Sequence, residues 1–94
     1  MKGISREEIE RVIDALETRR EQAERAGQME VASAYQHAID LLKAVVREQI
    51  KYLIDALETE AEKRMERYRQ ERDYYDWGFA EGLTYVIERL KGLI

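Results

Sequence analysis

Apolar residues recur every three or four positions along nearly the whole chain, which is the period of an amphipathic α-helix. Neither glycine nor proline interrupts this pattern between Gln28 and Trp77. We therefore expect one long central helix over about residues 29–72, roughly 65 Å long at about 1.5 Å per residue. Such a helix is longer than most in globular proteins, so a turn near Val46 to Gln49 is the alternative. The expected stripe consists of Ala32, Tyr35, Ile39, Leu42, Val46, Ile50, Leu53, Leu57, Ala61, Met65 and Tyr68.

A shorter helix is expected on each side of the central one. Ser5 and Glu8 have the spacing of a capping box, so the first helix begins at Ser5, and Gly27 supplies the left-handed residue that ends it. Its buried face consists of Ile9, Val12, Ile13, Leu16, Ala23 and Ala26. Asp73 or Asp76 can cap the last helix. The apolar face of that helix consists of Phe79, Leu83, Val86, Ile87, Leu90, Leu93 and Ile94.

The hexapeptide IDALET occurs twice, at residues 13–18 and again at residues 54–59, an offset of 41. Each copy is followed by a second amphipathic arm, IDLLKAV at residues 39–45 and IERLKGL at residues 87–93, and these arms are offset by 48. The extra seven residues equal about two helical turns, so the apolar phase is preserved. The pattern indicates a duplicated helical-hairpin unit.

We expect a single all-α domain over residues 1–94, with repeat units at about residues 5–46 and 47–94. Its elements are a short helix, a long central helix and a second short helix. Both short helices are expected on the same side of the long one, the last covering about Leu57 to Tyr68. Because 94 residues supply little chain to cover so long a stripe, we expect homo-oligomerisation, as a dimer or higher, to complete the bundle.

Composition and charge exclude several classes of function. The formal net charge is −4, so the chain would repel duplex nucleic acid. Cysteine is absent, which rules out disulfides, thiolate zinc sites and cysteine nucleophiles. No stretch is apolar enough for a secretory leader or for a membrane span of roughly 18 residues. We therefore expect a cytoplasmic protein with no membrane contact and no cofactor.

Catalytic and metal-binding patterns are not found in the sequence. His37 is the only histidine, and Ala34 occupies the position where a Glu-x-x-His metal motif has its glutamate. We interpret His37 as a residue at the flank of the apolar stripe. The serine and threonine hydroxyls lack a glycine-rich elbow or a neighbouring base. We therefore expect no enzyme activity, no catalytic residues and no metal site.

The strongest candidate binding surface combines arginines with aromatic residues. Arg64, Tyr68, Arg72 and Tyr75 would share one face of a helix, with Trp77 shortly after them. Alternating guanidinium groups and aromatic rings can stack on bases and pair with phosphates. Residues 58–73, however, carry six acidic and five basic side chains, so the surface has no net positive field.

Three interpretations of this surface remain open. The first is a protein interface in which the tyrosine, tryptophan and arginine side chains are the anchors. The second is a subunit interface that sequesters a small anionic ligand such as a nucleotide. The third is a structural scaffold or coiled-coil assembly protein, with an ordinary core and a solvated outer face. We favour a non-enzymatic, homo-oligomeric helical binding protein that occupies a partner protein through its second hairpin.

Gly78 and Gly82 form a second candidate feature, because they are four residues apart on one edge of the last helix. Glycine inside a helix costs about 1 kcal/mol relative to alanine. Two at this spacing suggest that another backbone, or a flat ligand, approaches closely. Close helix crossing is the interpretation that we favour.

The tail GFAEGLTYVIERLKGL, residues 78–93, resembles the ends of many small all-helical bacteriophage proteins. That resemblance covers about a sixth of the chain and implies a phage accessory protein acting in the host cytoplasm. The group includes inhibitors of host enzymes and oligomeric binders that sequester defence signalling nucleotides. The resemblance thus implies a chain that binds and inhibits a host protein, with nucleotide sequestration as the alternative.

Overall fold

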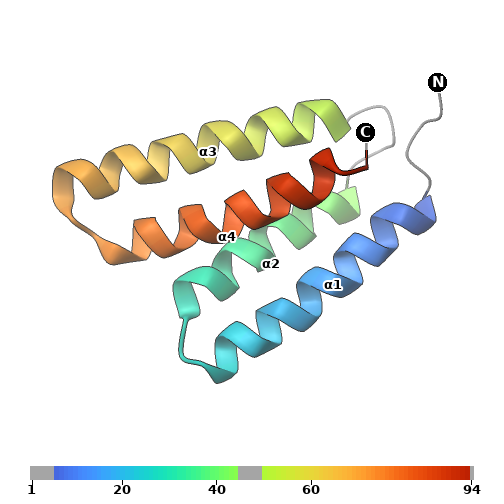
Figure 1. Cartoon of the computed structure of the whole chain (residues 1–94), viewed down its shortest axis with the longest axis horizontal. Helices are drawn as coiled ribbons and strands as arrows, with labels where there is room; N and C mark the ends of the chain where they lie inside the picture. Colours follow the sequence, from blue (N-terminus) through green and yellow to red (C-terminus); the bar gives the residue numbers. More distant parts are fainter. Residues whose placement is uncertain (1–5, 45–49, 94) are drawn as a thin grey trace.

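The computed structural model describes residues 6–44 and 50–93, which form two helical hairpins (Figure 1). The helices are α1 (Arg6–Arg25), α2 (Met29–Ala44), α3 (Ile50–Glu71) and α4 (Tyr74–Lys91). The turns between α1 and α2 and between α3 and α4 lie at the same end of the molecule, so α2 and α4 run parallel (Figure 1). The expected all-α fold is confirmed.

The prediction of one long central helix is wrong. The chain over this region forms two helices, and α3 runs antiparallel to α2 (Figure 1). The longest dimension of the molecule is 43 Å, too short for a straight helix over residues 29–72. The alternative turn near Val46 to Gln49 falls outside the described residues. The physical reason for the reversal is that it brings both halves of the stripe against α4, which packs on α2 as well as on α3.

The described residues of the expected stripe do face the core, although they belong to two helices rather than one. The stripe residues buried in α2 and α3 are Ala32, Tyr35, Ile39, Leu42, Ile50, Leu53 and Leu57, whereas Ala61, Met65 and Tyr68 are half-buried. The last helix was expected to cover only the second half of the stripe, but α4 also covers α2. One chain therefore buries most of its own stripe. This removes the shortage of covering chain as a reason for oligomers, and the subunit number stays a prediction.

The end of α1 follows the sequence prediction closely. Gly27 has a φ of +75°, and the N–H of Gln28 donates a hydrogen bond to the carbonyl oxygen of Ala23 at 2.9 Å. This is the Schellman pattern, in which a left-handed glycine lets the chain leave the helix. Ala26 is exposed rather than buried, because it lies beyond the last helical residue. The expected cap at Ser5 lies outside the described residues.

The turn between α3 and α4 is built from polar residues. Arg72 has a φ of +58°, so this turn places a non-glycine residue in the left-handed region. Asp73 then caps α4, because its Oδ1 accepts a hydrogen bond from the N–H of Tyr75 at 2.9 Å. Asp76, the other candidate cap, is 1% exposed and lies within α4. The expected apolar face is buried at Phe79, Leu83, Val86, Ile87 and Leu90, half-buried at Leu93, and outside the description at Ile94.

Gly78 and Gly82 lie where α4 approaches α2. A Cβ atom on Gly82 would lie 2.7 Å from the Cβ of Ala34, and one on Gly78 would collide with the Cγ of Glu30. The glycines thus allow a close helix crossing. Each touching pair is separated by 48 residues, the offset between the second arms in the sequence. That agreement is what duplicated hairpins packed symmetrically would produce, although duplication itself stays a prediction.

Candidate functional site

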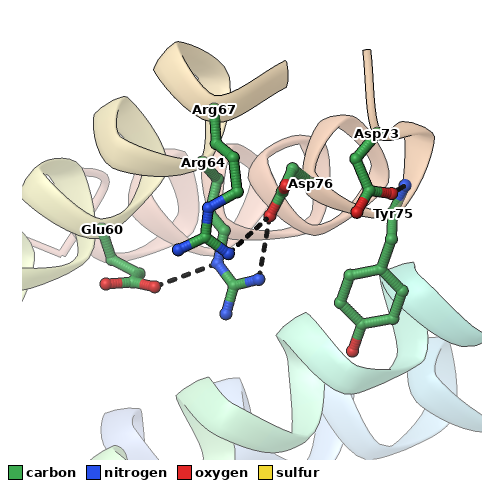
Figure 2. Close-up of polar contacts among 6 residues, drawn as sticks. All are labelled: Glu60, Arg64, Arg67, Asp73, Tyr75 and Asp76. Atoms are coloured by element: carbon green, nitrogen blue, oxygen red, sulfur yellow. Dashed lines mark hydrogen bonds and ion pairs between the residues drawn. The ribbon is translucent and has the colours of Figure 1, made fainter. Parts of the chain in front are cut away.

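Arg64, the first residue of the expected binding surface, lies in an ion-pair network between α3 and α4 (Figure 2). Arg64 binds Oε1 of Glu60 through its Nε and Oδ1 of Asp76 through an Nη, each at 3.0 Å. Arg67 approaches the same oxygen of Asp76 at 3.6 Å. The Arg64 guanidinium also lies 4.1 Å from the ring centroid of Phe79. The network therefore cross-links the second hairpin.

The charges of this network are satisfied internally. Burial on its own would lower the pKa of Arg64, but the hydrogen bonds that Arg64 donates to Asp76 and Glu60 outweigh that effect and hold the pKa above its ordinary value. Oδ2 of Asp76 is buried without a hydrogen-bond partner in the described residues, since both arginines bind Oδ1. A phosphate would have to compete with a buried carboxylate for Arg64. The network is therefore a poor anion receptor.

The structure separates Tyr68 and Arg72 from Tyr75. Tyr68 packs edge-on against Tyr74, with ring centroids 5.6 Å apart, and the Arg72 guanidinium lies 5.8 Å from the Tyr68 ring. Tyr75 instead stacks on Phe79 at 6.2 Å, and its ring points toward α2 (Figure 2). The expected single face is wrong, because α3 ends at Glu71 and Tyr75 belongs to the next helix.

A second cluster of an arginine with aromatic rings was missed from the sequence. The Arg19 guanidinium lies 4.0 Å from the Tyr85 ring centroid, and its Nε donates a hydrogen bond to the hydroxyl of Tyr35 at 3.4 Å. That hydrogen bond is the main cause that raises the pKa of Arg19 above its ordinary value. The three residues come from α1, α2 and α4, and no sequence spacing connects them. Only their tertiary arrangement reveals the cluster.

This cluster forms one wall of a groove with a volume of about 620 Å³, which we call the α4 groove. Its lining includes Arg19, Tyr35, Trp77, Glu81, Tyr85 and Glu88. Trp77 is 41% exposed, and its neighbour along the helix face, Glu81, is also exposed. Trp77 and Gly82 are the two sequence-predicted site residues that line this groove. The volume falls within the range of ligand sites, and an open groove of this kind also suits a protein segment.

Most of the large apolar side chains that are exposed in the described ranges lie at one end of the molecule. Met29, Tyr74, Tyr75 and Trp77 all lie at the end of the molecule where α2 and α4 begin, and we call them the aromatic end. Within the described ranges, Tyr52 is the remaining large apolar residue that is exposed, and it lies near the start of α3 at the opposite end (Figure 1). Exposed apolar side chains concentrated in one region are typical of interaction surfaces.

The remaining chemistry of the described residues is sparse. His37 is exposed, with its ring 6.0 Å from that of Phe79. The described part of the chain contains no group of three His, Asp or Glu side chains arranged to hold a metal ion. None of the four helices in the described ranges is both long and apolar enough to cross a bilayer.

Comparison with protein-family models, with curated proteins and with solved structures finds no match to this chain. The resemblance of the tail to bacteriophage accessory proteins therefore stays a prediction. The function is argued below from the α4 groove and the aromatic end.

Proposed function

We propose that this chain is a non-catalytic binding protein that occupies a partner protein through the aromatic end and the adjoining α4 groove. The carrying observation is that four of the five large apolar side chains exposed in the described ranges gather at this one end. Trp77 is one of these four residues and also lines the groove. Tryptophan, tyrosine and arginine are the residues that most often anchor protein interfaces.

The distribution of charge favours a protein partner over a free nucleotide. Asp76 engages both Arg64 and Arg67, so these guanidinium groups are already paired. The α4 groove carries two carboxylates, Glu81 and Glu88, which would repel a polyphosphate. Sequestration of an anionic nucleotide therefore has less support than a protein interface.

The residues that line the groove do not favour catalysis. The Thr84 hydroxyl donates a hydrogen bond to the carbonyl oxygen of Ala80 at 2.9 Å, so it is engaged within its own helix. No histidine is among the residues that line the groove. A nucleophile needs an adjacent base to be activated at neutral pH. These side chains favour binding over reaction.

We further propose, from the tail resemblance, a phage-type accessory protein that inhibits a host protein. We also keep the expected homo-oligomer as part of the proposal. The exposed aromatic end can bury surface against a second copy as well as against another protein. A native mass spectrum of the protein purified from cells would report subunit number and bound partners together.

Matched aromatic variants test the proposal. Trp77→Ala removes an anchor beside the groove, whereas Tyr52→Ala removes an exposed aromatic residue at the opposite end of the molecule. Tyr52 is 74% exposed and Trp77 is 41% exposed, so both variants should keep their helicity, and the melting temperature of each variant separates a loss of binding from a loss of fold. Partners recovered by affinity purification from the source cells should be lost with Trp77→Ala and retained with Tyr52→Ala. Equal recovery with both variants would refute the proposed surface.

A further inference from the structure

Two arginines stack on aromatic rings of α4, but only one of them has a carboxylate partner. Arg64 lies 4.1 Å from the ring centroid of Phe79 and binds Asp76 at 3.0 Å. Arg19 lies 4.0 Å from the ring centroid of Tyr85, and over the described ranges no carboxylate oxygen is within 4.0 Å of it. In the described part of the chain, the aromatic rings of α4 thus carry two such guanidinium groups, one paired with carboxylates and the other without them.

Two contacts position the exposed Arg19 side chain at the groove. Its Nε donates to the hydroxyl of Tyr35, which is 4% exposed, and its guanidinium lies over the Tyr85 ring. The hydrogen bond to Tyr35 uses Nε, and over the described ranges neither terminal amino group is in an ion pair. A planar guanidinium without a carboxylate partner can bind both oxygens of an incoming carboxylate.

We propose that Arg19 binds a carboxylate of the partner, an aspartate or glutamate side chain that enters the α4 groove. This inference rests on the proposed function and names the chemistry of the partner. Glu81 and Glu88 line the same groove and have no ion pair within the described ranges. Their charges therefore repel a ligand that carries two negative charges more strongly than a ligand that carries one. The groove therefore selects a singly charged carboxylate over a phosphate dianion, and a partner whose carboxylate is flanked by basic side chains.

The test follows the Nε–Hε signal of Arg19 by NMR during titration with three small probes. N-acetylphenylalanine carries a carboxylate and an aromatic ring, its amide is the neutral counterpart, and phenyl phosphate is a dianion at about pH 7.5. Only the carboxylate should shift the Arg19 signal saturably, and its affinity should exceed that of the amide about fivefold or more. Arg25, exposed at the end of α1, supplies the reference signal for nonspecific ionic effects.

Three variants separate a binding role of Arg19 from a structural one. Arg19→Gln should abolish the selectivity for the carboxylate over the amide. Arg19→Lys keeps the charge but removes the planar fork, and it should retain only part of that selectivity; it also assigns the Arg19 signal. Glu88→Gln should tighten carboxylate binding severalfold, because one repulsive charge is removed. A purely structural arginine would not respond to the charge at position 88.

The inference is overturned if the Arg19 signal tracks that of Arg25 in all three titrations, or if phenyl phosphate binds more tightly than the carboxylate. Recovery of partners with the Trp77→Ala variant distinguishes a wrong carboxylate assignment from a wrong proposed function. If Arg19 does not respond while Trp77→Ala still loses the partner, the interface stands and the carboxylate assignment is wrong. If carboxylate binding is intact while Trp77→Ala keeps every partner, Arg19 is an anion site unconnected with the proposed interface.

Discussion

The close crossing of α2 and α4 makes a prediction that two glycines can test against each other. In Gly82→Ala the new methyl group would lie 2.7 Å from the Cβ of Ala34, whereas carbon atoms pack best at about 3.5–4.0 Å. The neighbouring methyl belongs to a short side chain, so relief requires the two helix backbones to separate by about 1 Å. Overpacking of this kind typically costs about 1–3 kcal/mol.

The gain in helix propensity partly offsets this cost. Replacing glycine with alanine inside a helix contributes about 1 kcal/mol, so Gly82→Ala should lower the free energy of unfolding by up to about 2 kcal/mol. Gly78→Ala is the matched control. Its new methyl meets the side chain of Glu30, which can rotate away, so the expected change lies between zero and a gain of about 1 kcal/mol.

Urea and thermal unfolding, followed by circular dichroism, measure both variants. For a chain of this size, each kcal/mol should move the melting temperature by about 4–8 °C. Adding Ala34→Gly should rescue Gly82→Ala, because it removes the other methyl of the clash, although the same change destabilises the parent protein. A Gly82→Ala variant as stable as Gly78→Ala, or a double variant with purely additive losses, would show that α2 and α4 do not approach each other in this way.

Three further changes test other parts of the fold. Asp76→Ala should lower the free energy of unfolding, measured with urea, by about 2 kcal/mol. This is less than the roughly 3–5 kcal/mol typical of a fully buried pair, because the Arg64 side chain is 23% exposed; a loss below about 0.5 kcal/mol would show that water replaces the carboxylate. Leu57→Asp, at a residue 1% exposed, should cost several kcal/mol, whereas Glu62→Ala on the solvated side should cost less than about 0.5; comparable melting shifts would contradict the assigned core. Arg72→Gly should raise stability by about 0.5–1 kcal/mol, because glycine adopts the φ of +58° without strain; a lower melting temperature would refute this reasoning.

Much of the local structure follows from the sequence alone. The period of the apolar residues identifies the faces of all four helices, because a residue's position around a helix depends only on its place in the chain. The end of α1 is equally local, since Gly27 can adopt a left-handed conformation at no steric cost. The close crossing at Gly78 and Gly82 was also suggested by their spacing.

The tertiary structure decided the direction of α3 and the contacts of Arg19. Neither glycine nor proline occurs between α2 and α3, and the apolar period continues from one helix into the next. Periodicity alone therefore does not show that there are two helices or that α4 covers both. Asp76 could cap a helix as well as Asp73 by sequence, but its place within α4 turns it toward Arg64 instead. The sequence does not distinguish Arg19 from the other charged residues of α1. The packing of α1, α2 and α4 places it against Tyr35 and Tyr85. Contacts between helices depend on packing over the whole chain, whereas the helical period and Gly27 act within a few residues.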